Sequence, residues 1–226
     1  MTDVTEQDAA LKNAQTQIQA GNFAAASDIA RAVLATQPAH KNALYIAAVC
    51  ARYEGRHADA SARLAELMTV APDYGRAHQE EGHLKRALGD TDGALRAYER
   101  ATRFNPALIA SWTRQAELQA IAGNQQAAAN ARAQSERMKA LPRELLAVTN
   151  HVHEGRIFRG EEIARAFLRQ HPTHVEAMRL LADIGTRLSV HEDADFLLES
   201  AIELEPDNIQ LRLDYIQVLR KRQKYT

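Results

Sequence analysis

Histidine is the residue type in this sequence that is best suited to metal chemistry. His151 and His153 form the only H-x-H string in the chain. Residues two apart on a helix point about 200° away from each other, so both imidazoles cannot reach one ion from the same helix. We therefore expect solvated or turn-capping histidines here and no metal site. His40 and His174 each follow a proline by two residues, which favours a structural role at the start of the next helix.

Cys50 is the only cysteine, so the chain cannot form an internal disulfide or a cysteine-based metal site. A single thiol fits a reducing compartment, and we expect a cytoplasmic protein. Its neighbours Ala47, Val49 and Ala51 are small or apolar. This setting predicts a buried, inert thiol rather than a nucleophile.

The sequence shows no recognisable motif for cofactor binding or for acid–base catalysis. The glycines occur singly, and neither G-x-x-x-x-G-K-[ST] nor G-x-G-x-x-G occurs. Most carboxylates, such as Asp73, Asp90, Asp92 and Glu161, fall at expected turns and outer faces. We expect no catalytic residues, no cofactor and no enzymatic activity in these residues.

The charge balance bears on the class of partner. The 226 residues hold 28 Lys and Arg against 29 Asp and Glu, a net charge of -1, and only 5% are aromatic. Nucleic-acid binding is therefore disfavoured, because it needs a basic surface with stacking aromatics. A basic cluster at the C-terminus is either a phosphate patch or a complement to the helix macrodipole: Arg220, Lys221, Arg222 and Lys224. No apolar run approaches the length of about 20 residues that a membrane span requires.

The glycines and prolines define the elements that would position any site. Five glycines are separated by 34, 34, 34 and 32 residues: Gly21, Gly55, Gly89, Gly123 and Gly155. Ser189 occupies the position where this spacing would place a sixth glycine. Prolines keep the same spacing, since Pro38, Pro72 and Pro106 are 34 apart, as are Pro172 and Pro206. Between them the residues have helical periodicity. The pattern predicts helix pairs at about 7–36, 41–70, 75–104, 109–139, 143–170 and 175–204, and a lone helix at 209–222.

This 34-residue unit of two helices resembles the tetratricopeptide repeat. The third and fourth units carry the pattern most clearly, with small residues at close approaches, larger ones between pairs and proline at the end: Gly82, Gly89, Ala94, Tyr98, Ala101, Pro106 and Trp112. The resemblance implies an all-α, right-handed α-solenoid of six repeats plus a half. It also implies a non-catalytic module that binds a protein or an extended peptide in a concave groove lined by the first helices.

The pattern weakens after the fourth unit. Arg132 and Glu136 stand where apolar anchors are expected, and two residues are missing before Gly155. The segment 163–177 (IARAFLRQHPTHVEA) echoes 29–43 (IARAVLATQPAHKNA). We read two sub-arrays, 1–140 and 141–226. Drift of a single degenerate repeat explains the pattern equally well.

The last helix lacks the second half of its pair and reaches the turn position at Tyr225. It carries five apolar residues that one neighbouring helix cannot all cover: Leu211, Leu213, Ile216, Val218 and Leu219. We expect a second copy of the chain to cover them, giving a homodimer through this helix, or a missing helix to do so in a longer, truncated bacterial protein.

Groove-facing positions of the first helices supply the candidate site. They are Asn42, Tyr45, Val49, Arg52, Arg76, Gln79, His83, Arg86, Thr113 and Glu117. Arginine with tyrosine suits an extended or carboxylate-bearing peptide, because arginine forms forked hydrogen bonds and tyrosine gives rigid contact area. Ordinary solvated groove residues are the alternative. The family members that clamp chaperone C-termini use Lys and Asn where this chain has Tyr45 and Val49, so that specialised activity is not expected. A different alternative is that the array is the N-terminal regulatory or oligomerisation region of a sulfotransferase-like enzyme whose catalytic domain lies outside this chain.

Overall fold

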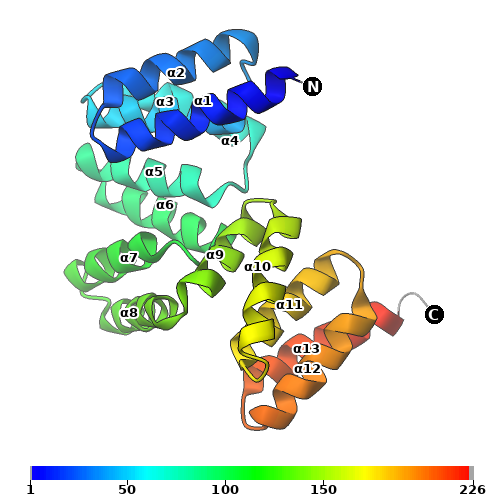
Figure 1. Ribbon diagram of the computed structural model, residues 1–226. Helices are drawn as coiled ribbons and strands as arrows, with labels where there is room; N and C mark the ends of the chain where they lie inside the picture. Colours follow the sequence, from blue (N-terminus) through cyan, green and yellow to red (C-terminus); the bar gives the residue numbers. More distant parts are fainter. Residues whose placement is uncertain (1, 224–226) are drawn as a thin grey trace. The chain divides into compact units, whose positions relative to one another are not determined.

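The computed structural model describes residues 2–223, with side chains over residues 6–222, and this part of the chain is folded into thirteen α-helices. Lys224 and Tyr225 lie outside the described residues. The helices are α1 (Thr2–Gln19), α2 (Phe23–Thr36), α3 (Lys41–Tyr53), α4 (His57–Val70), α5 (Gly75–Ala87), α6 (Thr91–Phe104), α7 (Ile109–Ile121), α8 (Gln125–Ala140), α9 (Arg143–His153), α10 (Ile157–Gln170), α11 (Val175–Arg187), α12 (His191–Leu204) and α13 (Ile209–Gln223). Figure 1 shows them following one another as hairpin-like pairs. The predicted all-α array of six helix pairs and a single last helix is confirmed.

Left-handed turns join the two helices within each pair. Gly21, Gly55, Gly89, Gly123 and Gly155 have φ angles of 79°, 74°, 79°, 81° and 84°. Glycine adopts this region without the steric cost that a Cβ imposes. Ser189, at the sixth turn, has φ 63° and is the only non-glycine residue with positive φ in the described part of the chain. The 34-residue grid of glycines therefore reflects a backbone requirement at each turn.

Small residues mark the places where the two helices of a pair approach closely. Ala94 and Ala101 on α6 are completely buried, as is the ring of Tyr98. A Cβ atom added to Gly82 on α5 would lie 2.6 Å from that ring. The contact between α5 and α6 thus needs glycine on one helix to accommodate tyrosine on the other.

The loops between pairs are tied to the helix that follows. His78 Nε2 lies 2.8 Å from the carbonyl oxygen of Pro72, and Trp112 Nε1 donates to the carbonyl of Pro106 at 2.9 Å. His40 Nδ1 and His174 Nδ1 each accept a backbone N–H of their own first turn, at 3.3 Å. The expected structural role of His40 and His174 at helix starts is confirmed.

The chain forms two compact units that divide within α8, between Ser135 and Glu136. In unit 1, α2, α3, α4 and α5 enclose cores that include Ala30, Leu44 and Leu67. In unit 2, α9 to α13 enclose cores that include Leu145, Ile184 and Leu198. The division of the chain into sub-arrays 1–140 and 141–226 stays a prediction.

The last helix packs against the preceding pair of helices through one face. Leu211 and Val218 are buried against α11 and α12, in a core with Met178 and Leu198. The sequence predicted that one neighbouring helix cannot cover all five apolar residues of α13, and the preceding pair of helices covers only one face of it. Leu213 and Ile216 remain 48% and 45% exposed.

Candidate interaction surface on the first helices

A buried ion pair joins two of the first helices of unit 1. The Arg52 guanidinium on α3 binds the Glu80 carboxylate on α5, and their side chains are 16% and 5% exposed. Burial raises the pKa of Glu80 although Arg52 opposes this shift. Arg52 also lies over the ring of Tyr53, 4.2 Å from its centre. Its charge is thus held between a carboxylate and an aromatic face, and it is less open to solvent than the sequence suggested.

His83 on α5 lies next to this pair. Its Nδ1 atom is 2.8 Å from the hydroxyl oxygen of Tyr98. The pKa of His83 falls to about 4, first because the ring is buried and then because of the positive charges of Arg52, Arg86 and Arg114. His83 is therefore neutral at physiological pH. Burial raises the pKa of the Tyr98 hydroxyl, although the same three cations oppose this shift.

Arg52, Arg86 and Arg114 come from three successive first helices, α3, α5 and α7, and we call them the arginine cluster. Arg52 is neutralised by Glu80, and Arg114 pairs with Glu117 at 2.7 Å on the exposed surface of α7. Arg86 is exposed and forms no ion pair with any other described residue. The cluster therefore keeps one uncompensated guanidinium that an incoming anion can bind.

The remaining predicted groove residues are half-buried and lie along the same helices. Tyr45 packs edge-on against Tyr74 at 5.8 Å, and Gln79 donates to the Ser111 hydroxyl at 3.0 Å. Asn42 and Arg76 lie in the first turns of α3 and α5. The structure brings Arg52, His83, Arg86 and, through Arg114, Glu117 together. The place of the other four residues in the site stays a prediction: Asn42, Tyr45, Arg76 and Gln79.

Two groove assignments need correction. Val49 is only 5% exposed and packs inside, because it follows the buried Ala48 and precedes the buried Cys50 in a helix covered on most sides. Thr113 uses its hydroxyl for the Ile109 carbonyl at 3.1 Å and for Ser135 at 3.1 Å. Val49 therefore offers little surface to a ligand, and the half-buried Thr113 already uses its hydroxyl within the chain.

Three members of this constellation were missed in the sequence: Glu80, Tyr98 as a hydrogen-bond partner, and Arg114. Glu80 and Arg114 are 34 residues apart and so occupy equivalent positions of successive repeats. Arg114 also stands three residues before Glu117, the spacing of a helical ion pair. The three-residue spacing to Glu117 was the feature of the sequence from which Arg114 could have been identified.

Other chemistry is sparse in the described residues. Cys50 is completely buried, and burial raises its pKa to about 11, as expected for an inert thiol. Among residues 2–223 no group of three or more His, Cys, Asp or Glu side chains could hold a metal ion. None of the described helices is long and apolar enough to cross a membrane.

Comparison with known proteins gives a family for part of the sequence. Residues 11–77 match a tetratricopeptide repeat family model. A search of curated proteins gives no match to the chain.

Solved structures of similar fold cover nearly the whole chain. A structure described as the functional characterisation of Pseudomonas aeruginosa pilF is 14% identical, with a TM-score of 0.56, over 98% of this chain and 100% of that one. A tetratricopeptide repeat protein from Parabacteroides merdae is 13% identical, with a TM-score of 0.50, over 95% and 99%. A chain in the structure of Naa15/Naa10 bound to HypK-THB is 14% identical, with a TM-score of 0.55, over 95% of this chain, which spans only 39% of that chain's length.

Such low identities establish the fold alone. Residues 11–77 thus match the tetratricopeptide repeat model, and the 34-residue period of paired helices with left-handed turns, together with these solved structures, shows that the chain has the helical-repeat fold of such proteins.

Proposed function

We propose that the first-helix face of unit 1 binds an extended, carboxylate-bearing peptide of a partner protein, and that the chain acts as a non-catalytic cytoplasmic scaffold. The observation that carries this proposal is Arg86, an exposed guanidinium without an ion-pair partner, beside two further arginines from neighbouring helices. Guanidinium groups bind carboxylates through paired, charge-assisted hydrogen bonds.

The neutral state of His83 adds to this recognition. With Nδ1 engaged by Tyr98, the ring is fixed in position and adds no fourth positive charge to the cluster. The surface therefore selects a small number of carboxylates in a fixed place. It does not attract polyanions such as nucleic acids.

The alternative of a regulatory or oligomerisation region attached to a sulfotransferase-like enzyme concerns residues outside this chain. It leaves the chemistry of the arginine cluster unchanged, because the cluster is built entirely from α3, α5 and α7. In that case the bound peptide would belong to the enzyme's substrate or partner.

Binding of an acidic peptide tests the proposal. The probe is a fluorescent decapeptide with alternating glutamate and alanine, and its glutamine counterpart is the control ligand. Arg86→Ala should weaken binding of the acidic probe by about tenfold without changing the melting temperature, because Arg86 has no ion pair to lose. Binding should also weaken as salt is raised.

Arg103→Ala is the matched control, since Arg103 is an exposed arginine on the second helix α6. It should bind the probe like the wild type. Equal affinity for both peptides, or equal loss in both variants, would place the binding surface elsewhere. Arg52→Ala is unsuitable here, because it leaves Glu80 buried without its partner and typically costs about 3 to 5 kcal/mol of stability.

A further inference from the structure

A long cleft on unit 1 lies away from the first-helix face. It runs between the second helices α2 and α4 and consists of two adjoining cavities of about 600 and 620 Å³. Both cavities are lined by Arg31 and Leu34 of α2 and by Arg63 and Glu66 of α4, so they form one continuous space. We call it the α2–α4 trough.

The trough exists because its floor and walls are made of small residues. Ala47 and Ala51 of α3 form the floor, and Ala24 and Ala62 line the two walls. Alanine side chains end at Cβ, so among residues 6–135 no side chain fills the space between the two helices. From Ala24 to Ala35 the α2 wall is about 16 Å long, roughly three helical turns.

Charge changes along the trough. The cavity at the N-terminal end of α4 is lined by four carboxylates and three guanidinium groups: Asp28, Glu54, Asp59, Glu66, Arg31, Arg56 and Arg63. The cavity at the C-terminal end of α4 keeps Arg31, Arg63 and Glu66 and adds exposed apolar side chains such as Pro38 and Val70. Each carboxylate of the first cavity is paired with one of its arginines, but Arg56 pairs with both Glu54 and Asp59, so this end keeps one net negative charge. The other end is apolar and keeps one net positive charge.

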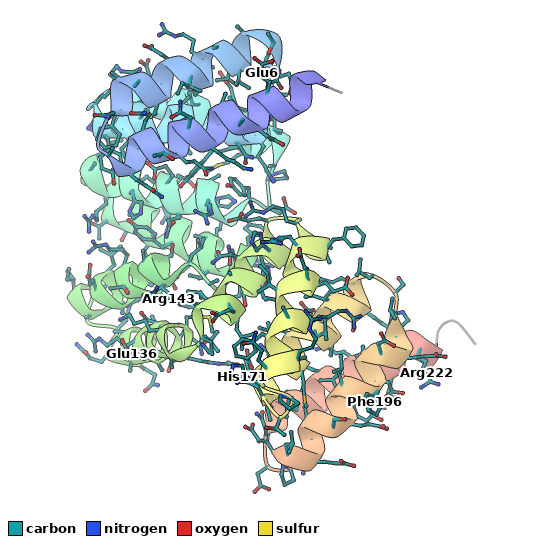
Figure 2. The ribbon with its side chains drawn as sticks, in the orientation of Figure 1. Glu6, Glu136, Arg143, His171, Phe196 and Arg222 are labelled. Atoms are coloured by element: carbon teal, nitrogen blue, oxygen red, sulfur yellow. The ribbon has the colours of Figure 1, made fainter. Side chains whose placement is uncertain are left out.

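The chain itself carries a helix with the complementary arrangement. Ile209, Leu213 and Ile216 lie on one face of α13, at i, i+4 and i+7, and are 72%, 48% and 45% exposed. The first turn of α13 has no acidic residue, and its last turn contains three cations, Arg220, Lys221 and Arg222. Arg222, labelled near the end of α13 in Figure 2, is paired with Asp195 of α12. Arg220 and Lys221 form no ion pair with another described residue.

We propose that α13 of a second copy of this chain occupies the α2–α4 trough, running antiparallel to α4. In this orientation Ile209 and Leu213 meet Pro38 and Val70, which are exposed, and the free cations Arg220 and Lys221 reach the end with the larger number of carboxylates. Each copy offers one trough and one α13, so the contact is head-to-tail rather than two-fold symmetric. Helix-in-groove packing of this kind uses anchors at i, i+4 and i+7.

Self-association of the full chain is the first measurement. Sedimentation velocity should show species larger than a monomer as concentration rises, and these should dissociate as salt is raised. A wild-type chain that stays monomeric up to about 1 mM would overturn the proposal. A foreign helix would then be the remaining occupant of the trough.

Two variants separate the two halves of the contact. Leu213→Asp places a charge on the exposed face of α13, and Ala62→Arg fills the trough wall and repels Arg220. Each variant alone should associate at least about tenfold more weakly than the wild type. Ile209→Asp changes a more exposed residue of α13. It should weaken association as much as Leu213→Asp does, provided that Leu213→Asp does not act by unfolding α13 locally.

Mixing the two variants gives the decisive result. Leu213→Asp retains an intact trough and Ala62→Arg retains an intact α13, so a mixture should form 1:1 dimers that neither variant forms alone. Failure to recover association in the mixture would contradict a head-to-tail contact. Phe158→Asp, which removes a 76% exposed phenylalanine of α10, is the control and should associate like the wild type. A loss of association in that control would contradict the trough as the site.

Discussion

At the scale of single residues, Ser189 departs from the rule that the other turns follow. It adopts φ 63° where five equivalent positions have glycine. A left-handed residue with a Cβ costs about 1 to 2 kcal/mol relative to glycine, although glycine also gains freedom in the unfolded chain. Ser189→Gly should therefore stabilise the chain by about 0.5 to 1 kcal/mol, measured by urea unfolding. Gly155→Ser should shift stability in the opposite direction, and a loss of stability in Ser189→Gly would show that the serine side chain contributes more than its backbone strain costs.

The residue scale also shows where sequence reasoning reached its limit at the site. His83 and Arg86 could be placed on the correct face because helical periodicity fixes the direction of side chains. Glu80 could not, because a glutamate in a helix is normally solvated and its burial depends on an arginine 28 residues earlier. Which long side chains pair with each other depends on how successive repeats pack, and the residue pattern of one repeat does not contain that information.

At the scale of helices, the close-approach positions determine how each pair packs. Ala94 is completely buried between α5 and α6, whereas Ala24 is exposed on α2. Ala94→Leu should lower stability by about 1 to 3 kcal/mol through overpacking, and Ala24→Leu should stay within about 0.5 kcal/mol. Thermal unfolding of the two variants measures the difference. Equal melting temperatures would contradict the assignment of the close-approach positions.

Helix positions were the most predictable feature of this chain. The predicted ranges 41–70, 75–104 and 175–204 coincide with the outer bounds of α3 and α4, of α5 and α6, and of α11 and α12. Proline and glycine set these ends through backbone geometry alone, without tertiary contacts. The covering of α13 was less predictable, because it depends on side chains from α11 and α12 that meet only in the folded chain.

At the scale of the whole molecule, the sequence irregularity after the fourth repeat predicts a difference in local stability. Arg132 and Glu136 are exposed on α8, at positions where the repeat pattern expects apolar anchors. Fewer apolar contacts permit easier local opening. Hydrogen exchange should be faster in residues 125–150 than in residues 57–104. Equal or slower exchange in 125–150 would show that the missing anchors are replaced by other packing.

The single buried thiol of Cys50 has a practical consequence for such measurements. It lies in the core formed by α1, α2 and α3, and a thiol with a pKa of about 11 is almost entirely protonated at neutral pH. Alkylating reagents attack the thiolate of an accessible cysteine. The rate of alkylation of the native chain therefore reports how often the second repeat opens, with no label introduced and no competing cysteine in the sequence.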